Sequence, residues 1–323
     1  MLAARLLLAL ALACLLTRAA AAAETVRVAA QKTGTLAWEL DVIRAHGLDK
    51  ETGIVIDAIA LASPEAGKIA LRGDTVDVIV SDWLWTTRER SLGGTLVFYP
   101  YSSTLGAVMV RQDSPIRSLA DLSGRTLAVA GGPLDKSWLL LQALARREGR
   151  DLARAATIAY GAPALLAEKT ARGEMDANLN YWNHCAALEA KGFRRLIAIE
   201  DVIAQLGAKG RPAMLGYVFD SRWAARNRAA ITGFLTATRR AKEILATSDA
   251  EWDRIAPLVA APDAETLAAI RTRYREGIPR RPIAEEETDA RLIYRVLAEV
   301  GGTELVGNAP ELDPGTFYHP PQD

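Results

Sequence analysis

The segment Ser118–Gly132 constrains the fold more than any other part of this chain. Its residue order predicts a short charged turn of helix, a glycine turn, a buried strand and a glycine-rich opening into a helix. It follows a strand-like apolar run at Ala107–Arg111 and lies near the middle of the chain. An α/β unit that begins afresh at mid-chain predicts two similar lobes, and the cleft between them would suit a small ligand.

The pattern before this segment predicts one lobe of order β-α-β-α-β. Short apolar or alternating runs mark its strands, and runs of helical spacing that end in glycine mark its helices. The predicted strands are 26–30, 54–61 and 76–80, and the predicted helices are 36–46 and 64–72. The last strand is apolar apart from Asp77, which is typical of parallel sheets that are covered on both faces.

The second half repeats this order. Its predicted strands are 126–130, 156–160 and 175–179, and its predicted helices are 134–148 and 162–172. Two further strands, 105–111 and 215–220, are expected to cross between the lobes. The remaining pattern predicts helices that pack back on the first lobe, at 223–246, 251–259, 264–274 and 285–300.

The prediction is therefore an α/β protein of two lobes with a helical carboxy-terminal part. We divide it into a signal peptide (1–23), the first part of lobe 1 (24–107), lobe 2 (108–214), a return to lobe 1 with the last helices (215–307) and an irregular tail (308–323).

The first 23 residues have the organisation of a secretory signal: Arg5, an apolar run at Leu6–Leu16 and a small-residue tract at Ala19–Ala23. Cleavage after Ala23 and a periplasmic location are expected. A lipid anchor at Cys14 is not expected, because the leucine usual three residues before a lipidated cysteine is missing. Only Cys185 then remains, so no intramolecular disulfide can form.

Charge excludes some classes of partner. The whole chain carries 39 basic and 39 acidic residues, and loss of Arg5 and Arg18 with the signal leaves a net charge of about −2. A net charge this small gives no reason to expect a nucleic acid or an anionic membrane as a partner. A monomer is expected.

Several short motifs resemble the substrate-binding proteins of ABC importers, of the nitrate, sulfonate and taurine type that includes binders of thiamine precursors. They are Val-Arg-Val-Ala at 26–29, Ala-Leu-Arg-Gly-Asp-Thr-Val-Asp-Val-Ile-Val at 70–80, the stretch 114–125 with the strand after it, and 172–177. The resemblance covers about residues 24–245. It implies a type II-like periplasmic-binding-protein fold that closes on one small molecule, with an inner-membrane permease and its ATPase as partners. The chain departs from the family pattern at 82–86 and 180–184, so the family's ligand is not transferred.

Aromatic residues gather where this fold would place its cleft. Five of the seven tryptophans lie on or beside the predicted cleft loops: Trp38, Trp83, Trp85, Trp138 and Trp182. An aromatic wall with a few polar groups suits a small-molecule pocket. The alternative is that each of them is a core residue, and Trp38 and Trp138 in particular could pack inward from their helices.

Polar candidates on the same loops complete the predicted binding site: Gln31, Thr33, Ser81, Asp82, Ser137 and Asn180, with Gly132 allowing close backbone approach. Thr35, Tyr181 and Asn183 lie on these loops too. Asp82 has two interpretations, a helix N-cap or a carboxylate that grips a cationic ligand between two tryptophans. Gly131-Gly132-Pro133 suits an anionic group instead. The charge of the ligand stays open.

Enzyme classes fit the sequence less well. The three histidines form no metal-binding motif, and the phosphate-loop, nucleophile-elbow and dinucleotide patterns are absent. We predict no catalytic residue, metal or cofactor. The alternatives are an accessory or sensory ligand-binding module, or an enzyme like the pyrimidine synthases of thiamine metabolism, which rely on a cysteine-rich segment absent from this sequence.

Overall fold

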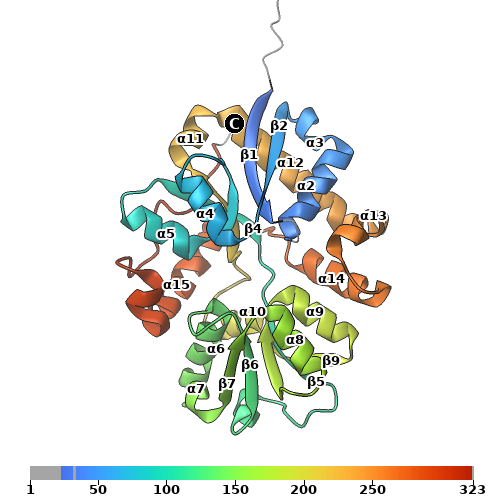
Figure 1. Cartoon of the computed structure of the whole chain (residues 1–323). Coiled ribbons are helices and arrows are strands. Elements are labelled where there is room, and N and C mark those ends of the chain that lie inside the picture. Colours follow the sequence, from blue (N-terminus) through green and yellow to red (C-terminus); the bar gives the residue numbers. More distant parts are fainter. Residues whose placement is uncertain (1–22, 32–33, 322–323) are drawn as a thin grey trace, which may run out of the picture.

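The computed structural model describes residues 23–31 and 34–321, which fold into two lobes joined by crossing segments of the chain (Figure 1). The two-lobed α/β fold predicted from the sequence is confirmed. Thr33, Cys14 and the predicted signal peptide up to residue 22 lie outside the described residues. Within the described ranges, no helix combines the length and the hydrophobicity needed to cross a membrane.

The first lobe is built on two small sheets. In one, β1 (Glu24–Gln31) and β2 (Ile54–Leu61) are parallel; the other has the order β3-β10-β4 and is antiparallel. A bridge between Val28 and Val78 links β1 to the residues just before β3. The remaining elements of this lobe are α2 (Thr35–His46), α3 (Leu48–Glu51), α4 (Pro64–Arg72), β3 (Ile79–Asp82), α5 (Trp83–Ser91), β4 (Leu96–Ser102) and β10 (Leu215–Asp220).

The second lobe holds one five-stranded sheet of order β7-β6-β8-β5-β9. In this sheet β6 is parallel to both of its neighbours, β7 and β8, whereas β5 runs antiparallel to both of its own. Its strands are β5 (Ala107–Arg111), β6 (Thr126–Ala130), β7 (Thr157–Gly161), β8 (Ala177–Asn180) and β9 (Phe193–Ala198). Its helices are η1 (Leu119–Leu122), α6 (Lys136–Arg147), α7 (Leu152–Ala155), α8 (Pro163–Ala171), α9 (Trp182–Ala190) and α10 (Ile199–Gln205).

The crossings themselves are irregular, which corrects the prediction of crossing strands. β5 lies wholly in the second sheet and β10 wholly in the first, so the chain crosses at 103–106 and 206–214. Carboxylates hold both segments, a half-buried one at Glu200 and a buried one at Glu286. Glu200 accepts a hydrogen bond from the Leu105 N–H at 3.0 Å, and Glu286 accepts one from the Ala213 N–H at 2.6 Å. Irregular backbone needs such side-chain acceptors because it has no strand partner.

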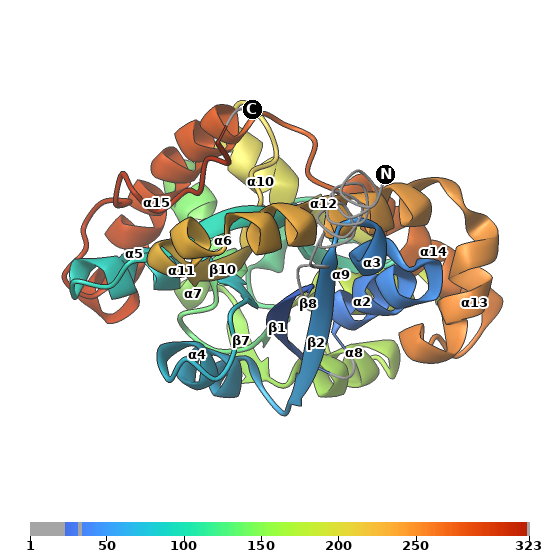
Figure 2. The same ribbon diagram turned by 90° about the horizontal axis from the view of Figure 1, so that it is seen from above.

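The carboxy-terminal helices contact both lobes, although we predicted packing on the first alone. α12 (Arg228–Thr247) and α13 (Asp249–Val259) pack on α2, but α14 (Ala264–Glu276) packs on α9 and α15 (Ile283–Val306) on α6. A bidentate ion pair joins α14 to α9: Arg273 donates to both carboxylate oxygens of Glu189 at 2.6 and 3.0 Å. Figures 1 and 2 show α15 on one side of the molecule and α13 and α14 on the other, with α12 running across the first lobe. The remaining helix, α11 (Ser221–Arg226), follows β10.

The described part of the tail has no helix, yet it is packed. Phe317 stacks edge-on against Phe98 and Tyr318 against Phe219, with ring centres 5.1 and 5.0 Å apart. These apolar contacts hold residues 308–321 against the β4 side of the first lobe.

Candidate functional site

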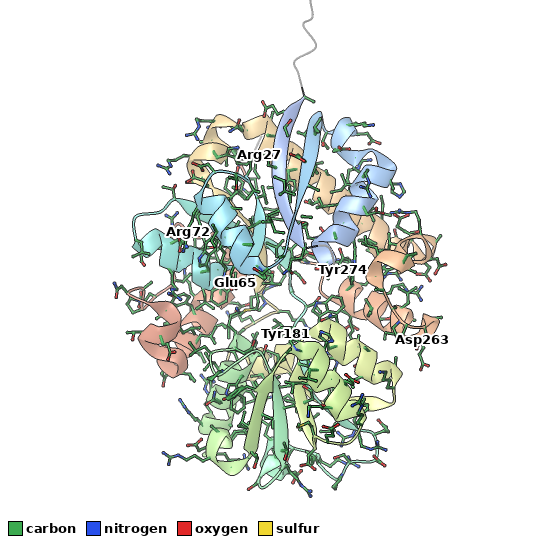
Figure 3. All side chains as sticks on the ribbon, viewed as in Figure 1. Arg27, Glu65, Arg72, Tyr181, Asp263 and Tyr274 are labelled. Atoms are coloured by element: carbon green, nitrogen blue, oxygen red, sulfur yellow. The ribbon has the colours of Figure 1, made fainter. Side chains whose placement is uncertain are left out.

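A cavity of about 510 Å³ lies between the lobes and is lined by residues of both. The first lobe contributes the ends of β1, β2 and β3 and the first turns of α2 and α4. The second lobe contributes Asp135–Ser137 before and within α6, and Tyr181–Asn183 at the start of α9. Figure 3 shows Glu65 and Tyr181, which both line the cavity, on facing edges of the two lobes. Ligands of open α/β sheets bind at this end of the strands.

Two other hollows of similar size are weaker candidates. One lies on the first lobe beside Arg27 and the other beside Arg195 on β9, with volumes of about 570 and 510 Å³. In both, charged side chains that line the hollow are paired with each other, as Arg27 is with Asp77 and Arg195 with Glu189. The cavity between the lobes is the one that domain closure would seal.

Five helices begin at this cavity, and they differ in how their first turns are satisfied. Ser63, Asp82 and Asp135 cap α4, α5 and α6 by accepting backbone N–H groups at 2.8–3.2 Å. By contrast, α2 begins after Gly34 and α9 after Tyr181 with no side-chain cap. Uncapped first turns carry free N–H groups and the positive end of the helix dipole. Two such ends face the cavity from opposite lobes.

An ion pair bridges the lobes inside the cavity. The Lys136 ammonium at the start of α6 lies 3.0 Å from a carboxylate oxygen of Asp82 at the start of α5. Burial alone would raise the pKa of Asp82, but the charge of Lys136 and the Trp85 N–H hold it below its ordinary value. The same carboxylate raises the pKa of Lys136. Both groups are therefore charged at neutral pH.

A second carboxylate lies next to this pair. Burial raises the pKa of Asp135, although the Tyr181 hydroxyl donates to it at 3.3 Å and its own helix donates two N–H groups. The pKa of Tyr181 is raised to about 12 by burial and by the charge of Asp135. Tyr181 is thus a neutral hydrogen-bond donor over the physiological range.

One wall of the cavity rests on a buried polar cluster. The hydroxyl oxygens of Thr35 and Tyr101, which both line the cavity, are 2.6 Å apart. Behind them the fully buried Glu39 accepts hydrogen bonds from Tyr217 and Tyr274, each at 2.7 Å, and pairs with the buried Lys242. Burial raises the pKa of Tyr101 well above its ordinary value, so its hydroxyl stays protonated.

The structure brings five of the predicted site residues to the cavity: Gln31, Ser81, Asp82, Ser137 and Trp182. Binding by these residues stays a prediction. Thr35, Tyr181 and Asn183 line the cavity as well. For Asp82 both interpretations have a structural basis, because it caps α5 and also faces a cation.

Four of the five tryptophans of the predicted aromatic wall lie outside the cavity lining. Trp38, Trp83, Trp85 and Trp138 are at most 8% exposed and pack in the core. Trp83 donates its indole N–H to the Ala213 carbonyl at 3.0 Å and packs on Tyr294. The physical reason is that these rings lie at or inside helix starts, on the face that packs against the protein rather than the face that meets the cavity.

Two further candidates also lie outside the lining. Asn180 is 2% exposed, and its amide serves the backbone by donating to the Pro163 carbonyl at 2.9 Å and accepting from the Tyr181 N–H. Gly132 is absent from the cavity lining, and Thr33 falls in the undescribed gap. Among the charged and tyrosine side chains of the lining, sequence reasoning missed five: Glu65, Lys68, Tyr101, Asp135 and Lys136. Only Asp135 and Lys136 gave a local signal, since they directly precede Ser137 at a helix start.

Within the described ranges, no cluster of three or more histidine, cysteine or acidic side chains is placed to hold a metal ion. Cys185 is fully buried, and burial raises the pKa of its thiol to about 12. A thiol in this state is a poor nucleophile.

A family model described as NMT1/THI5 like matches residues 45–251, more than half of the chain. No curated protein matches the sequence. Among solved structures, the periplasmic aliphatic sulphonate binding protein SsuA from Escherichia coli aligns with a TM-score of 0.73 and 20% identity, covering 93% of each chain.

Two other solved structures are similar. The alkanesulfonate-binding protein SsuA from Xanthomonas axonopodis pv. citri, bound to MOPS, has a TM-score of 0.65 and 18% identity over 91% of this chain and 98% of that one. The desulfurization enzyme DSZB has a TM-score of 0.62 and 15% identity, covering 91% and 96%. At such identities the likeness shows a shared fold.

Proposed function

Because the chain belongs to the NMT1/THI5-like family, we propose that it is an exported solute-binding protein that delivers a small organic molecule to an ABC import permease. One observation carries this proposal: the 510 Å³ cavity is lined by both lobes, so closing the lobes would enclose a ligand. The similar solved proteins include an aliphatic sulphonate binding protein and an alkanesulfonate-binding protein, which supports it.

The organisation of the mature protein follows from this function. Cleavage after Ala23 would release residues 24–323 into the periplasm, with lobe 1 at 24–107 and 215–307 and lobe 2 at 108–214. The permease would recognise the closed lobes. The protein would act as a monomer, because one chain supplies both walls of the cavity.

For the ligand we propose a small molecule that carries an oxyanion, a sulfonate or a carboxylate. Two uncapped helix starts, those of α2 and α9, face the cavity from opposite lobes and can both donate to such a group. Hydroxyl donors at Thr35 and Tyr181 stand beside them. An oxyanion held by N–H groups of both lobes would stabilise the closed form.

A binding role rather than catalysis fits the same cavity. Among the described residues, the lining contains no cysteine or histidine, and Cys185 is fully buried outside it. The likeness to DSZB reflects the fold, which binding proteins and enzymes share.

The test is binding without turnover. The mature protein would be titrated by calorimetry and thermal shift with ethanesulfonate, taurine, MOPS, β-alanine and butanoate, with each mixture then analysed by mass spectrometry. We expect at least one probe to bind at one site per chain and to raise the melting temperature, with the probe recovered unchanged. Conversion of a bound probe would show an enzyme, and absence of any binding would overturn the proposed ligand class.

A further inference from the structure

We propose that Lys136 is a built-in substitute for an ammonium group of the ligand, holding the empty lobes together through Asp82 until the ligand displaces it. This inference rests on the proposed function and deepens it. It makes Asp82 the residue that selects ligands with an amino group in addition to an oxyanion.

The two partners differ in mobility. Asp82 is fixed, because one carboxylate oxygen accepts the Trp85 N–H at 2.8 Å as the cap of α5 while the other faces Lys136. Lys136 is tethered only by its flexible stem, and its side chain is 32% exposed against 14% for Asp82. When the pair separates, the partner that leaves must be the one that water can solvate, since an unpaired buried carboxylate is costly. Lysine is that partner.

The position of Lys136 also argues against a purely structural role. It is the first residue of α6, where a positive charge opposes the helix dipole. Its ammonium reaches across to the other lobe rather than pairing with its neighbour Asp135, which is occupied by two N–H groups of α6 and by the Tyr181 hydroxyl. We therefore attribute the lysine at this position to its ion pair with Asp82 rather than to any stabilisation of α6.

The remaining charges of the cavity leave the exchange feasible. Lys68 and Glu65 on α4 line the same cavity, and the charge of Lys68 lowers the pKa of Asp82 further. Lys68 also lies 5.5 Å from the centre of the Trp85 ring, so it is held beside the ring rather than at the carboxylate. An amino group entering from the ligand would therefore compete with Lys136 alone for direct contact with Asp82.

The first arm of the test needs no ligand. Spin labels on Ile69→Cys of α4 and Leu165→Cys of α8 would report the distance between the lobes, because both positions are exposed and the native Cys185 is fully buried. We expect Lys136→Met and Asp82→Asn each to shift the distribution of the empty protein toward longer distances. Asparagine caps helices as well as aspartate does, so Asp82→Asn should fold normally. Glu89→Gln, which breaks an ion pair within the first lobe, is the matched control.

The second arm compares taurine with propane-1-sulfonate, which replaces the ammonium by a methyl group. We expect the wild type to bind taurine about tenfold more tightly, as a charge-assisted hydrogen bond permits. Asp82→Asn should abolish this preference, and Lys136→Met should enlarge it by removing the competitor.

The two arms separate the two proposals. An unchanged inter-lobe distance in both variants would overturn the substitute role of Lys136. A wider distance without selective binding of taurine would keep the ion pair as a latch and overturn the exchange with a ligand ammonium. Binding of neither probe, with a wider distance, would remove the proposed oxyanion class and leave the latch standing.

Discussion

The ammonium of Lys242 lies 4.1 Å from the centre of the Tyr101 ring, directly behind one wall of the ligand cavity. This cation is buried and pairs with Glu39, which two tyrosine hydroxyls also reach. The wall that presents Thr35 and Tyr101 therefore rests on a charged cluster rather than on apolar packing. Removing one partner of a buried ion pair leaves the other charge unpaired in the protein interior, which strongly destabilises the fold.

Lys242→Met should lower the free energy of unfolding by about 3–5 kcal/mol, because it leaves Glu39 as an unpaired buried carboxylate. Urea denaturation measures this loss. Arg239→Met, which breaks the exposed pair with Glu243, should cost less than about 1 kcal/mol. In the double variant Lys242→Met/Glu39→Gln, most of the stability should return. A double variant as unstable as the single one would contradict this account.

Two tryptophans should respond oppositely to replacement by alanine. Trp83→Ala should destabilise the protein by about 3–5 kcal/mol, since the ring is fully buried. Trp182→Ala should fold and bind ligand about tenfold more weakly, because this ring is only partly buried and lines the cavity. Thermal unfolding and calorimetry together separate the effects. A stable Trp83→Ala protein with weakened binding would restore the aromatic-wall hypothesis.

Gly106 should tolerate no side chain. A Cβ atom there would lie 1.8 Å from the Asn180 carbonyl oxygen, where the first crossing segment meets the end of β8. Gly106→Ala should therefore cost about 1–3 kcal/mol or more and displace the crossing. Gly132→Ala is the control, because a Cβ at Gly132 has no atom within 4 Å. Equal melting temperatures of the two variants would refute the contact.

His184 should make stability depend on pH below neutrality. Burial lowers its pKa, so the folded protein binds a proton less readily than the unfolded chain does. The stability that the neutral His184 ring contributes is fully present above its pKa in the unfolded chain. It is lost as pH falls from that value toward the lower pKa of the folded protein. The melting temperature should thus fall more steeply between about pH 7 and pH 5 in the wild type than in His184→Gln. Parallel curves would show that His184 is not the titrating group.

Local sequence signals predicted the secondary structure of both lobes closely. The strands 54–61 and 126–130 and the helix 64–72 have the predicted bounds. The last follows from Ser63, whose side chain caps it, and from Pro64 at its first position. The prediction omits the strands β4 and β9 and the helices α5, α9 and α10. It is also wrong where the chain passes between lobes, because a strand-like run at 105–111 does not tell which sheet it joins.

The site was harder to predict from the chain alone. Asp82 and Lys136 are 54 residues apart, and Tyr101 lies in a strand whose apolar pattern suggests only a core position. The tryptophans were predicted to line the cleft because they lie on or beside its loops. A position on such a loop does not fix the direction in which the ring points. Whether a ring at a helix start faces the cavity or the core depends on how that helix packs, which no local pattern carries.

The sequence by itself determined the repeated β-α-β-α-β order of each lobe, the two-lobed fold and four of the stretches of chain that meet at the cavity. These follow from near neighbours: apolar period, capping residues and turn glycines act within a few residues. Only the tertiary structure decided which side chains line the cavity, which helix starts stay uncapped and which charges meet across the lobes. Those features depend on packing between segments far apart in the chain, where burial and pairing are set by the assembled protein.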